Sequence, residues 1–67
     1  MTEREVERIV RDVMTTKGVR AALLRAERLD RRWQITVRDE SDRIMSFYVP
    51  DTPAAVRAAV GGWTDLI

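Results

Sequence analysis

The side chains best suited to binding a charged partner lie in one basic segment, residues 17–32. This segment holds six basic and two acidic residues, whereas the whole chain has a formal net charge of only +1. An arginine guanidinium can donate paired hydrogen bonds to phosphate oxygens, so clustered arginines could contact a nucleic-acid backbone. The candidates for such contacts are Arg20, Arg25, Arg28, Arg31 and Arg32. The opposing interpretation is a solvated surface, on which the arginines pair with nearby acids. Such pairs contribute little to stability or function.

A second polar group, Asp39-Glu40-Ser41-Asp42, is the densest set of carboxylates in the chain. Carboxylate oxygens are the ligands that hard divalent cations prefer. Asp and Ser are also favoured in tight turns, because their side chains accept hydrogen bonds from the backbone that follows them. We expect a hairpin turn here and no metal site.

Groups for proton transfer or nucleophilic attack are scarce. The chain has neither His nor Cys, which removes the commonest general base and the usual metal ligands. Its only adjacent glycines, Gly61-Gly62, match no phosphate-binding loop. A chain of 67 residues also has little interior left for a pocket once its core is filled. We therefore expect a non-enzymatic protein that has no cofactor.

Composition also bears on location. No apolar run approaches the ~20 residues that a membrane-spanning helix needs, and Met1–Glu5 is mostly polar and charged. The absence of cysteine fits a reducing compartment. We expect a soluble cytoplasmic protein that has no signal peptide and does not bind membranes.

The elements that must position these side chains are clearest at Trp33–Val37 and Ile44–Val49. The first run alternates large apolar and polar residues, and the second is rich in aromatic and β-branched residues. Together they predict an antiparallel hairpin around residues 38–43, in which Asp39 faces Arg43. That register pairs Val37 with Met45, Ile35 with Phe47 and Trp33 with Val49 on a face committed to the core, and Thr36 with Ser46 and Gln34 with Tyr48 on the other.

A helix is predicted before this hairpin. Thr2 and Glu5 have the spacing of a capping box. An apolar stripe at helical spacing follows, consisting of Val6, Ile9, Val10, Val13 and Met14. Because Gly18 can adopt the left-handed conformation that ends a helix, we expect the helix over residues 2–17.

A second helix is predicted after the hairpin. Thr52 is the expected N-cap, and Pro53 suits the first helical position because its missing N–H costs nothing there. Gly61-Gly62 is expected to end or kink this helix before Trp63.

Residues 19–32 decide the fold, and their pattern allows two interpretations. Their Ala, Leu, Arg and Glu favour a helix, which gives the order ααββα. A strand with Ala22, Leu24 and Ala26 on one face gives the order αβββα. We favour the strand, because an isolated hairpin is marginal in water, whereas three strands covered by helices can bury a core. The expected α+β protein is one domain, residues 1–67, in which a three-stranded antiparallel meander is covered by N- and C-terminal helices in two layers.

A partner would bind on the face of the sheet that the helices leave uncovered. Leu24, Ile44 and Tyr48 are expected to form an apolar patch there. Trp63 either docks on a partner or folds back on its own core. A small chain without disulfides also gains stability by pairing. We therefore expect a protein-interaction module, a homodimer or an accessory subunit of a larger complex, which uses Leu24, Ile44, Tyr48 and Trp63. The alternative is a nucleic-acid-binding module that uses the Arg-rich segment 20–32.

Overall fold

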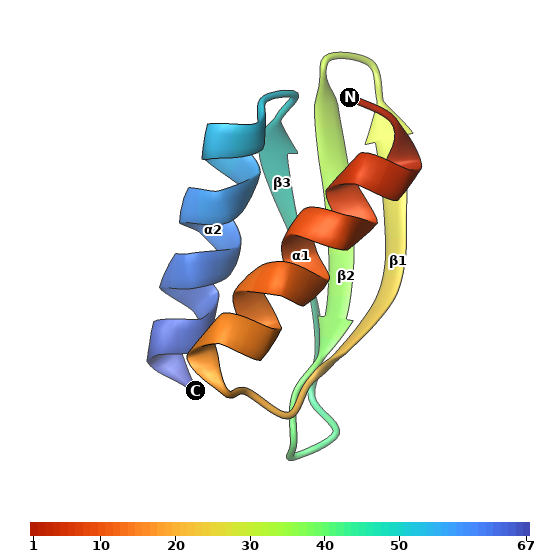
Figure 1. Ribbon diagram of the computed structural model, residues 1–67. Helices are drawn as coiled ribbons and strands as arrows, with labels where there is room; N and C mark the ends of the chain where they lie inside the picture. The colour runs from red at the N-terminus through yellow and green to blue at the C-terminus, as the bar shows by residue number, and fades with distance from the viewer.

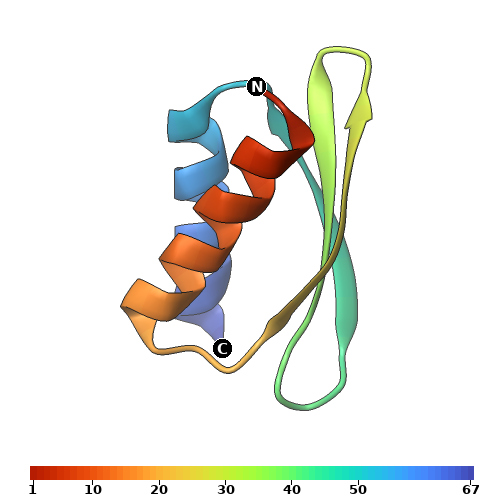
Figure 2. The same ribbon diagram turned by 45° about the vertical axis from the view of Figure 1, so that its right-hand side comes forward.

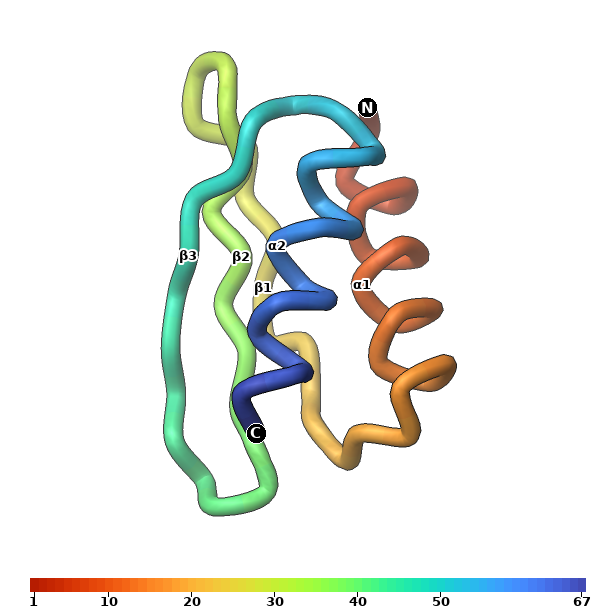
Figure 3. The backbone as a smooth tube through the Cα atoms, turned by 90° about the vertical axis from the view of Figure 1, so that its left-hand side faces the viewer, coloured from red at the N-terminus to blue at the C-terminus, as the bar shows by residue number.

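The computed structural model describes all 67 residues, which form a layer of helices packed on a layer of strands (Figure 1). The chain forms α1 (Glu3–Lys17), β1 (Ala22–Leu29), β2 (Arg32–Arg38), β3 (Ile44–Pro50) and α2 (Pro53–Leu66). The strands make one antiparallel sheet in the order β1-β2-β3. Both helices lie on the same face of this sheet (Figure 3). The predicted αβββα order is therefore confirmed, and the alternative order ααββα is wrong.

The β2–β3 hairpin has the predicted register. Val37 pairs with Met45, Ile35 with Phe47, and Trp33 with Val49, while Thr36 pairs with Ser46 and Gln34 with Tyr48. The backbone N–H of Asp39 donates to the carbonyl of Arg43 at 3.0 Å and closes the turn. On the uncovered face, the hydroxyls of Thr36 and Ser46 are hydrogen-bonded at 2.8 Å.

Strand β1 departs from simple alternation at Leu24. Its register with β2 shifts between Leu23 and Arg25, so Leu24 is the extra residue of a β-bulge. Ala26 is buried among the core residues, with 4% of its surface exposed, whereas the register puts Ala22 on the opposite face. The prediction that Ala22, Leu24 and Ala26 share one face is therefore wrong, because the bulge inverts the alternation between them.

The core lies between the helices and the inner face of the sheet. Its 13 buried apolar residues are Val6, Ile9, Val10, Val13, Met14, Ala26, Trp33, Ile35, Val37, Val49, Val56, Val60 and Trp63. Phe47 is half-buried against this core, but Met45 is 44% exposed. The first half of β3 lies away from the helices (Figure 2), so the prediction that Met45 is committed to the core is wrong.

Helix α1 begins and ends as predicted. The side chain of Thr2 accepts a hydrogen bond from the Glu5 amide, and the Glu5 carboxylate accepts one from the Thr2 amide. Gly18 follows the last helical residue with φ 69°. Glycine adopts this left-handed conformation at little cost, which is why the helix ends there.

Helix α2 starts at the predicted cap but does not stop at Gly61-Gly62. Thr52 accepts a hydrogen bond from the Ala55 amide at 3.2 Å, and the helix continues to Leu66. The continuation places the Trp63 ring in the core. Burying an indole is worth several kcal/mol, whereas glycine in a helix interior costs only ~1 kcal/mol per residue. The predicted end or kink is therefore overridden by packing.

Candidate functional site

One face of the sheet is covered by no helix (Figure 2), and we call it the outer face. All three strands contribute to it. The register arranges its residues in four rows across the strands: Leu29, Arg32 and Pro50; Glu27, Gln34 and Tyr48; Arg25, Thr36 and Ser46; Ala22, Arg38 and Ile44. Polar and charged side chains dominate the middle strand, and the large apolar ones lie on the outer strands.

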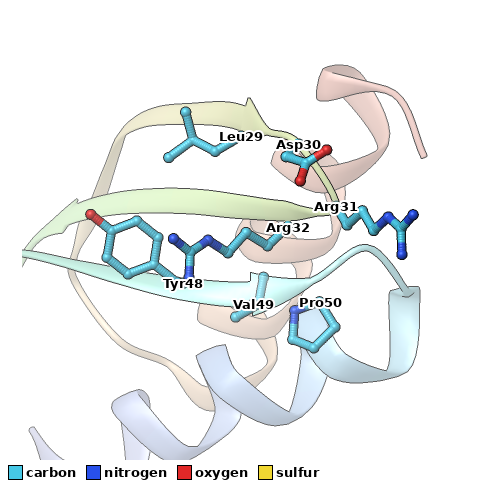
Figure 4. Close-up of a pocket in the computed structure, with 7 residues that line it drawn as sticks. All are labelled: Leu29, Asp30, Arg31, Arg32, Tyr48, Val49 and Pro50. Atoms are coloured by element: carbon cyan, nitrogen blue, oxygen red, sulfur yellow. The ribbon is translucent and has the colours of Figure 1, made fainter.

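One end of the outer face is organised around Arg32 and Tyr48. The Arg32 guanidinium carbon lies 4.8 Å from the centre of the Tyr48 ring (Figure 4), which is a cation–π contact. The two side chains line a shallow open depression together with Leu29, Asp30, Arg31, Val49 and Pro50. The stacking leaves the guanidinium free to donate hydrogen bonds to a carboxylate or a phosphate.

The structure separates the residues that were expected to form one apolar patch. Ile44 and Tyr48 are 64% and 52% exposed, but they lie about 13 Å apart along β3 with Ser46 between them. Leu24 is 43% exposed in the bulge of β1, and β2 separates it from β3. The three side chains are accessible, but they are not contiguous.

Trp63 does not lie on the surface. Its side chain is 5% exposed, and its ring centre lies 6.3 Å from that of Phe47. Of the two expected outcomes for this residue, the structure has the one in which the tail folds back on its own core. Leu66 and Ile67, the last residues, remain exposed.

The basic segment is spread over the length of the molecule. Arg20 precedes β1 and Arg31 follows it, and the intervening strand of eight residues spans about 26 Å. Two of the arginines are paired with acids: Arg25 lies 3.1 Å from Glu27, and Arg28 lies 2.9 Å from Asp51. The five candidate arginines therefore do not form one patch.

The acidic residues of the β2–β3 turn face different partners. The Asp39 carboxylate accepts hydrogen bonds from the amides of Ser41 and Arg43, at 2.8 and 3.0 Å. Glu40 accepts one from the Arg20 amide at 3.2 Å. No three acidic side chains converge here or elsewhere. The predicted turn is confirmed, with Asp39 holding its backbone.

A residue that the sequence did not single out, Asp51, joins three parts of the chain. Its carboxylate accepts a hydrogen bond from the Trp33 indole at 2.7 Å, lies 2.9 Å from the Arg28 guanidinium and 3.3 Å from the N-terminal ammonium. The hydrogen bond from Trp33 is the main reason why the pKa of Asp51 lies below its ordinary value of 3.8. Partial desolvation of the carboxylate acts in the opposite direction and raises the pKa. A buried indole N–H needs an acceptor, and the register places Asp51 two residues after Val49, which pairs with Trp33.

The two edges of the sheet differ in chemistry. Strand β1 carries a bulge and the charged residues Arg25, Glu27 and Arg28, which are features that discourage pairing with another strand. Strand β3 has no bulge and no charged residue from Ile44 to Pro50. It is therefore an uncharged and largely apolar free edge.

Comparison with known proteins adds no relative: no family model matches the chain, and searches of curated proteins and of solved structures found no match. The helices are all too short or too polar to cross a membrane. Function must therefore be inferred from the residues described above.

Proposed function

We propose that this protein is a small non-enzymatic interaction module, a homodimer or an accessory subunit, that binds another protein chain through β3. The observation that carries the proposal is the exposure of Ile44, Met45 and Tyr48. These are three of the six large hydrophobic residues exposed on the molecule, and they lie on one strand without a charge. An uncharged edge strand with exposed apolar side chains along it is typical of a surface that pairs with another chain.

The composition of the interior supports a role without catalysis. The one buried polar residue is Thr64, and its hydroxyl donates to the carbonyl of Gly61 at 2.9 Å. No ionisable side chain is among the buried residues, whereas catalytic sites commonly hold such groups away from water. The absence of cysteine supports a cytoplasmic site of action.

Nucleic-acid binding is the second candidate, and the contact between Arg32 and Tyr48 favours it. An aromatic ring beside an arginine can stack on a base while the guanidinium holds a phosphate. Arg31, in the adjacent turn, makes no salt bridge of its own. Binding of this kind would weaken steeply as salt concentration rises, whereas an apolar protein contact would not.

Photo-crosslinking in the cells that make the protein tests the proposal. We would replace Tyr48 with a photoreactive phenylalanine derivative, and use the same replacement at Arg8, on the exposed side of α1, as the control. The proposal expects adducts with protein from position 48 and few from position 8. Equal yields from both positions, or no protein adduct, would contradict it, and adducts with nucleic acid would favour the second candidate.

A further inference from the structure

We propose that β3 pairs antiparallel with β3 of a second copy of this chain, centred on Ser46, so that two three-stranded sheets become one continuous sheet. This inference rests on the proposed function, because it names the partner that β3 binds and the geometry of the contact.

The backbone groups that face the free edge of β3 follow from the hairpin. The Asp39 N–H donates across the turn to the Arg43 carbonyl. Hydrogen-bonded and non-hydrogen-bonded pairs alternate along antiparallel strands, so the residues of β3 that bond to β2 are Met45, Phe47 and Val49. The N–H and C=O groups of the residues between them therefore point away from the sheet, and these residues are Ile44, Ser46 and Tyr48.

Pro50 agrees with this assignment. It occupies the next outward position of β3. A residue at such a position donates no hydrogen bond to β2, so the missing N–H of proline costs nothing there. Its carbonyl accepts a hydrogen bond from the Thr52 amide at 2.8 Å. Tyr48 is therefore the last residue of β3 whose outward N–H and C=O groups have no partner.

A two-fold pair centred on Ser46 uses all of these groups. Ile44 of one copy then faces Tyr48 of the other, and the two Ser46 residues face each other, so that every outward N–H meets an outward C=O. A pair centred on Phe47 would instead place Ile44 opposite Pro50. Because Pro50 has no N–H, the carbonyl of Ile44 would have no donor. The Ser46 register is therefore the better of the two.

The same register also matches the side chains. Ile44 and Tyr48, which are exposed on the outer face, become cross-strand neighbours between the two copies. On the inner face, Met45 of each copy lies opposite Phe47 of the other, where a thioether and an aromatic ring make a favourable contact. No charge on β3 opposes the pairing. The edge of β3 is complementary to itself, which is why we assign a second copy and not another protein.

Two substitutions at the centre of the edge test the inference. Ser46→Pro removes an N–H that points away from β2 and is used only in the pair. Ser46→Ala keeps this N–H, and both variants lose the hydroxyl contact with Thr36. Gln34→Lys, in the middle of the outer face on β2, leaves the β3 edge intact.

The readout is sedimentation equilibrium over a wide range of protein concentration, with circular dichroism to verify folding. The wild type, Ser46→Ala and Gln34→Lys are expected to dimerise. Ser46→Pro is expected to dissociate about tenfold or more readily, since the hydrogen bonds across the axis are lost. If Ser46→Pro does not fold, Tyr48→Lys, which adds an edge charge without changing the backbone, must weaken the dimer instead.

Each contrary outcome identifies what has failed. A wild-type dimer that survives Ser46→Pro but not Gln34→Lys would overturn the edge pairing and indicate contact through the outer face, with the interaction role intact. A wild type that is monomeric at every concentration would overturn the second copy as partner. Protein adducts from position 48 would then still support the interaction role, and their absence would overturn that role as well.

Discussion

Substituting the paired glycines of α2 with alanine tests whether this helix is continuous. Gly61 and Gly62 lie in the helix interior, and a Cβ added at either position would meet no atom within 4 Å. Alanine has a higher helix propensity than glycine by about 1 kcal/mol. Each substitution should therefore stabilise the protein by ~0.5–1 kcal/mol, because the unfolded chain loses conformational freedom that the helix does not use.

Thermal and urea unfolding, followed by circular dichroism at one protein concentration, provide the assay. A gain of ~1 kcal/mol raises Tm by about 4–8 °C in a protein of this size. Gly18→Ala is the matched control, since Gly18 has φ 69° and alanine there should destabilise by ~1 kcal/mol or more. If Gly61→Ala and Gly62→Ala destabilised the protein as Gly18→Ala does, the helix would end at the glycines and our account of α2 would be refuted.

Two further predictions concern the core and the Asp51 contacts. Trp63→Ala should cost about 3–5 kcal/mol in urea unfolding, because it empties a core position; a loss below ~1 kcal/mol would show that the ring is not buried. The groups that donate to the Asp51 carboxylate lower its pKa in the folded protein. Asp51 therefore stabilises the fold at pH values above its ordinary pKa of 3.8, and this stabilisation is lost as the pH falls below that value. Asp51→Asn should therefore reduce the loss of stability in acid, measured by urea unfolding at a series of pH values. If the stability of Asp51→Asn fell in acid as steeply as that of the wild type, the role of Asp51 would be contradicted.

The register of the β2–β3 hairpin could be predicted because successive side chains of a strand point to opposite faces of the sheet. A shift of one residue would divide the apolar side chains between the two faces. The strand at residues 22–29 was harder, since its composition favours a helix. The strand is favoured because a hairpin alone is marginal in water and because no Gly or Pro stops a second helix before Trp33. The position of the bulge had no signal, because Leu23, Leu24 and Arg25 include no residue that marks a break in a strand.

Other features depended on long-range packing that a local pattern does not contain. Local propensity predicts that the glycines of α2 end or kink the helix, but the burial of Trp63 outweighs that propensity. The acceptor for the Trp33 indole is Asp51, 18 residues away in sequence. Met45 fits the apolar pattern of its strand, and only the course of β3 away from the helices leaves it exposed. The exposure of Ile44 and Tyr48 follows from the register, and the rise of ~3.3 Å per residue along a strand keeps the two side chains about 13 Å apart.

Hydrogen exchange at single backbone amides tests the pairing of β3 most directly. The amides of Met45, Phe47 and Val49 bond to β2 within one copy, so they should be protected at every protein concentration. The amides of Ile44, Ser46 and Tyr48 face the free edge, so they should exchange quickly in dilute protein and become protected as the concentration rises. If these three amides exchanged quickly at all concentrations, β3 would not pair with a second copy.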